Sequence, residues 1–202
     1  PLFLAVSHNN FKAYFEYPKS VELIKRMCVL GTNSSSLILD FFSGSATTAH
    51  AIMQLNAEDG GNRKFVMVQL PEETAEDSEA YKAGYKNICE IGKERIRRAG
   101  KKIKNEHPEA KDLDTGFRVF KCESSNYKEM MKAPKDYDQS QLEMYIDNIK
   151  EDRTDLDLLF DCMLRWGVEL SLPLSSQKVD GCTIHNVNDG DLVACFDGHV
   201  TE

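Results

Sequence analysis

The sequence predicts an α/β protein whose first part holds a parallel sheet, followed by a smaller α+β region. Two apolar runs, 36–42 and 63–70, are separated by a turn of small residues, a helical stretch and a polar loop. A strand, a helix and a strand in that order form a βαβ unit, with parallel strands and a right-handed crossover. After residue 111 the pattern changes to short strand-like and helical patches. We therefore expect two structural regions, 1–111 and 112–202.

The composition fits a soluble globular protein. The chain has 202 residues, of which 41% are hydrophobic and 29% charged. That length suffices for one domain, or for a domain with a small appendage. A net charge of −8 argues against a basic, histone-like coat protein, but it does not exclude DNA, because charge distribution matters more than the sum.

We expect neither a membrane-spanning helix nor a signal peptide. No apolar run reaches the roughly 18 residues of a membrane-spanning helix. The six apolar residues at the start lack the basic beginning of a signal peptide. The chain begins with Pro1 rather than methionine, so we expect a processed product or a piece of a longer protein.

The cysteines and histidines give no sign of a metal site in their spacing. The six cysteines are scattered, and no two lie within ten residues of each other. No carboxylate or cysteine lies at ligand spacing from His8, His107, His185 or His199. We expect buried thiols in a reducing cytoplasm, and no metal.

The first region is divided by turn residues into regular elements. A helix begins after 17–20, where apolar residues recur at helical spacing, and it ends at 31–35. The continuous apolar strand 36–42 is typical of a strand buried in a parallel sheet. A turn at 43–46, a helix at 47–55, a polar loop at 56–62 and a second buried strand at 63–70 follow.

The longest predicted helix covers 80–104. Its apolar residues step by three and four along one face, and the other faces are basic, with ten lysines and arginines against four acids between Lys82 and Lys111. The basic faces have two interpretations. They are a solvated helix surface, or a strip facing DNA phosphates. The candidates for DNA contact are Arg95, Arg97, Arg98, Lys101 and Lys102.

The second region predicts a strand at 116–121, amphipathic helices within 136–170 and two short strands within 178–197 around an Asn/Asp/Gly turn. Consecutive amphipathic helices are typical of a small helical subdomain or of a subunit contact. Their apolar stripes are Leu142, Tyr145, Ile146 and Ile149, and then Leu156, Leu159, Phe160, Met163 and Trp166.

The most informative segment is 40–48, DFFSGSATT. A buried strand delivers Asp40 at its carboxyl end, a turn of small residues lets a ligand approach the backbone, and a helix N-terminus follows. Ligands of doubly wound folds bind at this edge. Asp40 suits an ammonium group and the helix start suits a carboxylate. Neither G-x-G-x-x-G nor a P-loop is present, and the turn alone is a weak signal.

The run 40–50, DFFSGSATTAH, resembles the S-adenosylmethionine motif of amino-DNA methyltransferases. Segments 15–24, 53–65, 68–73 and 91–100 are similar to the methylation (modification) subunit of type III restriction–modification systems, and the resemblance is specific from about Phe15 to Lys121. It implies part of a Rossmann-like, S-adenosylmethionine-dependent methyltransferase sheet. Region 1–111 would bind the cofactor, and region 112–202 would contact another subunit or DNA.

The resemblance also implies residue roles. Asp40 would bind the methionine amino group, and Thr47 and Thr48 would cap the helix and reach the carboxylate. Gln69 would meet the ribose hydroxyls. The complete set of implied cofactor contacts is Asp40, Phe41, Phe42, Ser43, Gly44, Ser45, Thr47, Thr48, Lys19, Ser20 and Gln69.

The sequence departs from the pattern of the family in two ways. Ala46 replaces a glycine of the motif, which costs about 1 kcal/mol or more if the position needs a positive φ. The catalytic [DN]-P-P-Y motif is absent, because no two prolines are adjacent. The resemblance places that motif and the target-recognition region upstream of Pro1. The chain is then the C-terminal portion of the enzyme, and we expect it to be inactive alone.

The resemblance implies methyl transfer to adenine N6 in double-stranded DNA, with the base flipped out. It also implies a restriction subunit as partner and self-association of the methylation subunit. Two alternatives remain open. One is a non-catalytic interaction module that docks another subunit through 142–166. The other is a small-molecule methyltransferase, which the segment 54–73 and the basic helix disfavour.

Overall fold

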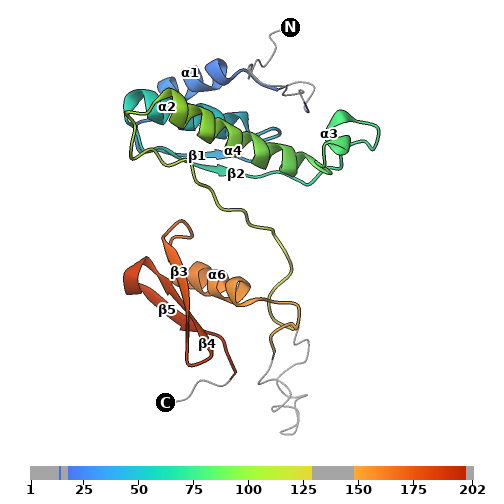
Figure 1. Cartoon of the computed structure of the whole chain (residues 1–202), viewed down its shortest axis with the longest axis vertical. Coiled ribbons are helices and arrows are strands. Elements are labelled where there is room, and N and C mark those ends of the chain that lie inside the picture. Colours follow the sequence, from blue (N-terminus) through green and yellow to red (C-terminus); the bar gives the residue numbers. More distant parts are fainter. Residues whose placement is uncertain (1–13, 15–17, 129–147, 199–202) are drawn as a thin grey trace. The chain divides into compact units, whose positions relative to one another are not determined.

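The computed structural model describes residues 14, 18–128 and 148–198. They form two compact units that meet in the chain between Phe117 and Arg118 (Figure 1). The segment after 111 still belongs to the first unit, because Leu113 and Phe117 pack against its core. Within the described ranges, no helix is long and apolar enough to cross a bilayer.

The first unit contains the predicted βαβ arrangement. Its elements are α1 (Val21–Gly31), β1 (Leu37–Asp40), α2 (Thr47–Asp59), β2 (Lys64–Met67), α3 (Glu79–Lys82) and α4 (Ile88–Glu106). The strands β1 and β2 pair in parallel, with Leu37 opposite Lys64 and Asp40 opposite Met67. This confirms the parallel pairing expected from the sequence.

Helix α2 lies at the centre of the first unit and contacts α1, α4 and β2. It is buried on most sides, and its small residues Ala49 and Ala51 allow neighbouring helices to approach. Met53 packs with Ile96 and Ile103 of α4 in the main core cluster. The helix that follows the turn after β1 is therefore fixed firmly relative to β1 and α4.

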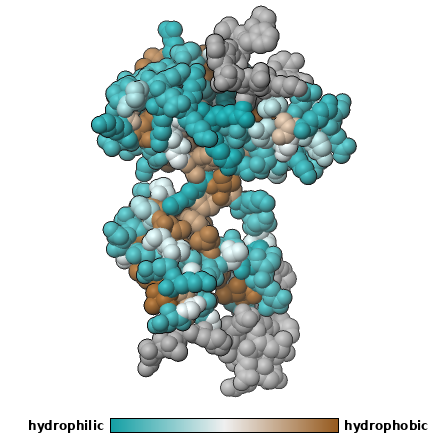
Figure 2. Space-filling model, viewed as in Figure 1, coloured by the Kyte–Doolittle hydropathy of each residue, from teal (hydrophilic) through white to brown (hydrophobic). Residues whose placement is uncertain are grey.

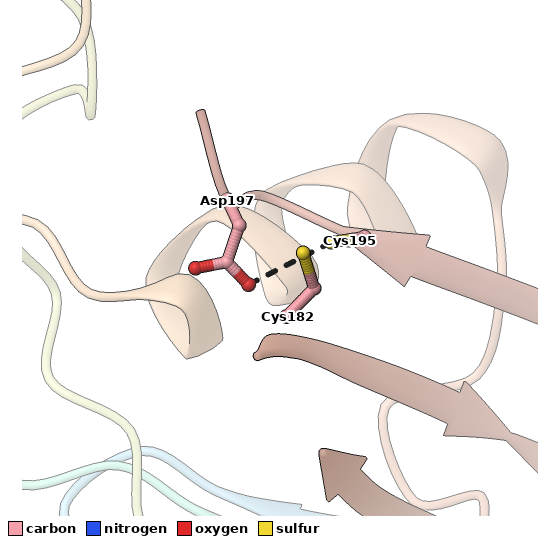
Figure 3. A group of neighbouring side chains, drawn as sticks. All are labelled: Cys182, Cys195 and Asp197. Atoms are coloured by element: carbon pink, nitrogen blue, oxygen red, sulfur yellow. Dashed lines mark hydrogen bonds between the residues drawn. The ribbon is translucent and has the colours of Figure 1, made fainter. Parts of the chain in front are cut away.

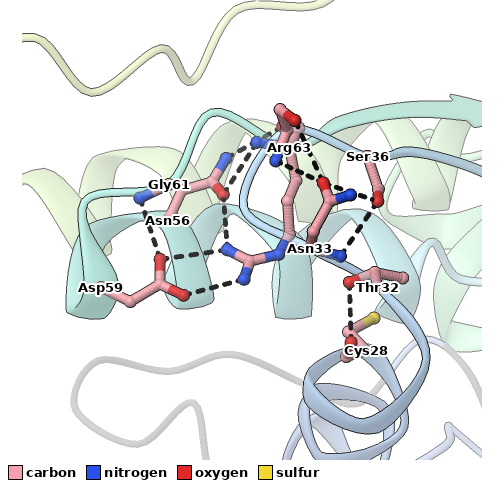
Figure 4. A network of polar contacts seen from close by, with 9 residues as sticks. Cys28, Thr32, Asn33, Ser36, Asn56, Asp59, Gly61 and Arg63 are labelled. Carbon is pink, nitrogen blue, oxygen red and sulfur yellow. Dashed lines mark hydrogen bonds and ion pairs between the residues drawn. The ribbon is translucent and has the colours of Figure 1, made fainter.

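The end of α2 differs from the sequence prediction. The helix continues to Asp59 and stops at Gly60, which adopts the left-handed conformation with φ 69°. Behind it, the Asn56 amide binds both backbone groups of Arg63, with Nδ2 donating to the carbonyl at 2.9 Å and Oδ1 accepting from N–H at 3.1 Å (Figure 4). The Arg63 guanidinium pairs with Asp59 at 2.9 Å. These contacts fix the loop that leads into β2.

The predicted helix 80–104 is two helices. Between α3 and α4 the chain turns at Gly84, whose φ is 95°. Asn87 then caps α4 by accepting the Glu90 N–H at 3.1 Å. A favourable glycine turn and a new N-cap therefore prevail over the continuous helical periodicity.

The strands of the first unit are not buried on both faces as expected. Leu37 and Leu39 are 65% and 59% exposed, while the alternate residues Ile38 and Asp40 are half-buried. The helices cover one face of β1–β2 in the described part of the chain. Figure 2 shows hydrophobic patches (brown) between polar side chains on the visible face of the molecule.

In the described part of the second unit, α6 packs on a three-stranded antiparallel sheet. Its elements are α6 (Asp155–Trp166), β3 (Leu174–Val179), β4 (Cys182–Val187), the 3₁₀ turn η3 (Asn188–Gly190) and β5 (Leu192–Cys195), and the sheet order is β3–β4–β5. The two predicted strands and their Asn/Asp/Gly turn are confirmed. The strand β3 was not predicted. The predicted strand at 116–121 was wrong, since that segment is assigned no strand in the structure.

The core of the second unit is built from Leu159 and Met163 of α6 against Val187 and Leu192. The helix begins with a capping box of Thr154 and Asp157. Two residues of the predicted apolar stripe do not join this core: Leu156 is 45% exposed and Trp166 is 69% exposed. Of the first predicted stripe, Leu142, Tyr145 and Ile146 lie outside the described residues.

Candidate functional site

The carboxylate of Asp40 lies where β1 ends and fastens the following turn. Its Oδ2 accepts a hydrogen bond from the Thr48 hydroxyl at 2.6 Å, and its Oδ1 accepts the Phe42 N–H at 3.3 Å. The side chain therefore joins the start of the turn to the first helical turn of α2. A carboxylate held in this way stays at the carboxyl edge of the parallel strands.

The turn itself needs two left-handed residues. The Ala46 N–H donates to the Ser43 carbonyl at 2.8 Å, and Gly44 has φ 51°. Ala46 has φ 58° and ψ 40°, the conformation that its motif glycine would adopt freely. The strain expected from the sequence is therefore present. The methyl group of Ala46 is buried in the core beside Ala49, and its burial contributes a stabilisation of similar size.

The end of β2 holds the turn from the other side. The Gly44 N–H donates to Gln69 Oε1 at 2.8 Å, and the Ser43 N–H donates to the Val68 carbonyl at 3.2 Å. The Gln69 amide nitrogen donates to the Leu70 carbonyl at 3.2 Å. In this structure the Gln69 side chain supports the turn. The sequence resemblance implied a contact of Gln69 with the ribose hydroxyls and did not suggest this supporting role.

Arg95 of α4 points into the unit rather than toward solvent. Its Nη1 donates to Ser45 Oγ and to Thr47 Oγ1, both at 2.8 Å. Burial lowers the pKa of Arg95 to about 10. Within the described residues, its Nε and Nη2 are buried without a hydrogen-bond partner. The helical spacing Ile91, Arg95, Ala99 on the apolar face was the signal that could have placed this residue inside.

Helix α4 also packs closely on the turn through Gly92. A Cβ at this glycine would lie 3.4 Å from the Gly44 carbonyl oxygen and 3.6 Å from the Ala46 Cβ. The residue therefore sits where a larger side chain would press on the turn. The turn 43–46 is thus held by β1, β2 and α4 together.

The remaining predicted cofactor residues are exposed. Ser20 accepts the Leu23 N–H at 3.4 Å as the N-cap of α1, and Lys19 is exposed. Within the described contacts, neither is hydrogen-bonded to Asp40 or to the turn. Phe41 and Phe42 are 61% and 76% exposed, with ring centroids 5.2 Å apart. They place exposed aromatic surface directly after Asp40.

The predicted DNA contacts separate into two groups. Arg95 faces the turn, whereas Arg97, Arg98 and Lys101 are exposed and Lys102 is half-buried. Arg98 pairs with Glu94 at 2.5 Å, and Lys102 pairs with Glu106 at 3.6 Å. Pairs of this kind along one helix are common on solvated surfaces and lower the net positive field. The geometry favours the solvated-surface interpretation for these paired residues.

The site combines features that suit a zwitterionic ligand. Asp40 supplies a negative charge, and α2 begins without a side-chain cap, so its first N–H groups can meet an anion. The Arg95 guanidinium adds a positive charge beside Thr47. An amino acid moiety, with its ammonium and carboxylate, matches this donor set. The residues present therefore fit the methionine part of S-adenosylmethionine.

Comparison with known proteins identifies a matching family and several relatives. Residues 3–101 match the sequence profile of a DNA methylase family. The Mod subunit of the type III restriction–modification enzyme StyLTI of Salmonella typhimurium is 42% identical over 107 residues, 53% of this chain and 16% of that subunit. The EcoPI Mod subunit of Escherichia phage P1 is 43% identical over 106 residues, 52% of this chain and 16% of that subunit.

A methyltransferase of another type is also similar. The type II methyltransferase M.KpnI of Klebsiella pneumoniae is 39% identical over 77 residues, 38% of this chain and 18% of that protein. The matches confirm the resemblance that the sequence motifs indicated. Each match spans less than a fifth of the relative's own length.

Proposed function

We propose that this chain, a relative of type III methylation subunits with a DNA methylase segment at residues 3–101, is the S-adenosylmethionine-binding portion of a site-specific adenine-N6 DNA methyltransferase. One observation carries the proposal: the Asp40 carboxylate is fixed beside the uncapped start of α2. When bound, S-adenosylmethionine supplies a methyl group on a sulfonium. The residues of this chain bind and orient it.

The roles follow from the contacts. Asp40 takes the ammonium of the methionine moiety, and the first N–H groups of α2 take its carboxylate. The turn 43–46 lets the ligand approach the backbone, while Gln69 and Arg95 hold that turn in place. Phe41 and Phe42 offer aromatic surface beside it. Lys19 and Ser20 precede α1 and are proposed to reach the same ligand from the exposed side.

The test is calorimetric titration of the full chain with S-adenosylhomocysteine. We expect binding by the unaltered chain and its loss in Asp40→Ala. Asp112→Ala is the matched control, because Asp112 is an exposed acid outside the site and should leave binding unchanged. Equal binding by Asp40→Ala, or none by a folded unaltered chain, rejects the proposed cofactor-binding role of this chain.

The transfer step needs groups that the chain does not carry. No [DN]-P-P-Y motif is present to hold the amine of a flipped adenine. We therefore propose that double-stranded DNA and a restriction subunit are partners of the whole enzyme, and that this chain alone transfers no methyl group. Measurable incorporation of labelled methyl into unmethylated DNA by the purified chain contradicts that.

A second candidate function is docking by the second unit, including self-association. It is favoured by Leu164 and Trp166 of α6, which are 64% and 69% exposed. Sedimentation over a range of concentrations tests it. Association that weakens in Trp166→Ala supports docking, and a monomer at every concentration argues against it.

A further inference from the structure

The second unit brings together three possible metal ligands that are distant in the sequence. Cys182 begins β4, Cys195 ends β5, and Asp197 follows two residues later (Figure 3). One ligand atom from each lies within 4.8 Å of the other two. The spacing of the cysteines along the chain gives no hint of this, because the register of the sheet creates it.

The register explains why the side chains meet. Cys195 pairs with Ile184, so Cys182, two residues before Ile184, is the diagonal neighbour of Cys195 on the same face. Asp197 continues the alternation that puts every second residue on that face. Neighbouring strands thus supply two soft sulfur ligands and one carboxylate at one end of the sheet.

The same register disfavours a disulfide. Diagonal neighbours in an antiparallel pair have Cα atoms about 7–8 Å apart. A disulfide requires about 4.4–6.8 Å. A tetrahedral zinc ion with bonds of about 2.3 Å to sulfur instead separates its sulfur ligands by about 3.8 Å, since it lies between them. A bridging ion therefore suits this pair better than a direct bond.

The carboxylate is already oriented. The Thr183 N–H donates to Asp197 Oδ2 at 2.5 Å, and Cys195 Sγ lies 3.7 Å from the same oxygen. That sulfur–oxygen distance is close to the separation of two ligands on one tetrahedral zinc. Support of a ligand by a neighbouring N–H is typical of metal sites.

We propose that Cys182, Cys195 and Asp197 form a zinc-binding site in the second unit. Zn²⁺ is held by two thiolates and one carboxylate oxygen, and water fills the fourth position. On binding, each thiol releases its proton to solvent. The ion joins the first residue of β4 to the chain just after β5 and so stabilises this end of the sheet. The inference is independent of the proposed methyltransferase function.

The test uses the full chain, reduced and freed of metal, titrated with Co²⁺ as a probe and then with Zn²⁺. We expect one equivalent of Co²⁺ with thiolate-to-cobalt absorption and tetrahedral visible bands, displaced by Zn²⁺. Zn²⁺ should also raise the melting temperature. Cys182→Ser and Cys195→Ser should each weaken binding at least tenfold and remove the rise in melting temperature.

The controls separate this site from adventitious binding. Cys122→Ser alters an exposed cysteine outside the cluster and should bind Co²⁺ like the unaltered chain. Asp197→Asn keeps the shape of an exposed side chain but removes its charge, so it should weaken Co²⁺ binding. This variant tests the proposal if a cysteine variant fails to fold. The proposal is overturned if the unaltered chain shows no thiolate–cobalt absorption. It is equally overturned if Cys182→Ser, Cys195→Ser and Asp197→Asn all bind as the unaltered chain does.

Discussion

Ala46 shows how one residue can be strained and useful together. Its left-handed backbone costs roughly 1 kcal/mol for a residue with a Cβ, while burying its methyl group contributes a similar amount. The side chain is 2% exposed, so the methyl contributes fully. The strained backbone and the buried methyl therefore nearly cancel.

This balance predicts the effect of two substitutions on stability. Ala46→Gly removes both the strain and the methyl, so its free energy of unfolding should stay within about 1 kcal/mol of the unaltered chain. Ala46→Val places a β-branched residue at φ 58° and should destabilise by at least about 2 kcal/mol. Denaturant unfolding measures both. A strongly destabilised Ala46→Gly would show that methyl burial dominates.

Replacing Arg95 should change cofactor binding even when the positive charge at this position is kept. Arg95→Lys keeps a positive charge but loses the planar group that donates to Ser45 and Thr47 together. The turn then loosens, and S-adenosylhomocysteine should bind about tenfold more weakly, which corresponds to about 1.4 kcal/mol. Arg97→Lys is the control, because Arg97 is exposed on the same helix. Equal affinity of the two variants would exclude the proposed support of the turn.

At the scale of elements, the sequence predicts correctly the helices, strands and turns that local signals determine. The helix after Ser20, the strand–turn–helix around Asp40 and the hairpin of β4 and β5 follow from caps, turns and periodicity. The break between α3 and α4 was missed, because the apolar face runs through it and hides the turn at Gly84.

Contacts between elements were beyond the reach of sequence patterns. Arg95 belongs to a run of basic residues. Its helical spacing from Ile91 and Ala99 was a signal for an inward position, but the packing of α4 shows which groups it contacts there. Gln69 holds Gly44 across 25 positions of the chain. Cys182 and Cys195 meet through strand register, which is a non-local property of the sheet.

The loop between α2 and β2 gives a prediction at this scale. Asn56→Ala leaves the buried N–H and carbonyl of Arg63 without partners, so the free energy of unfolding should fall by roughly 2–4 kcal/mol. Asn33→Ala is the matched control. Its amide also binds a turn, but it is exposed, and the loss should stay below about 1 kcal/mol. Similar losses in urea unfolding would mean that burial of the Asn56 network is unimportant.

For the whole molecule, the sheets of both units leave apolar side chains exposed in the described chain. Leu37 and Leu39 of the parallel pair are exposed, and so are Val179 and Val193 of the antiparallel sheet, which packs on α6 through its other residues. Parallel sheets are normally covered on both faces. The first unit therefore depends strongly on the packing of α2 between α1 and α4, where His50 is buried.

The burial of His50 predicts how the stability of the first unit changes with pH. Burial lowers the pKa of His50 from 6.5 to about 4, and the positive charges of Arg95, Lys102 and Lys25 add to the effect. Between these values the unfolded chain binds a proton at His50 and the folded chain does not. Stability from this group is therefore complete above pH 6.5 and is lost as the pH falls toward 4. By pH 5 the loss is about 2 kcal/mol.

Urea unfolding at pH 7.5 and pH 5 measures this loss. His50→Gln should flatten the dependence by about 2 kcal/mol over that interval, because glutamine takes up no proton in either state. His107→Gln should leave it in place, since His107 is only half-buried and lies beyond the end of α4. An unchanged slope in His50→Gln would mean that carboxylates, rather than this buried imidazole, cause the acid sensitivity of the first unit.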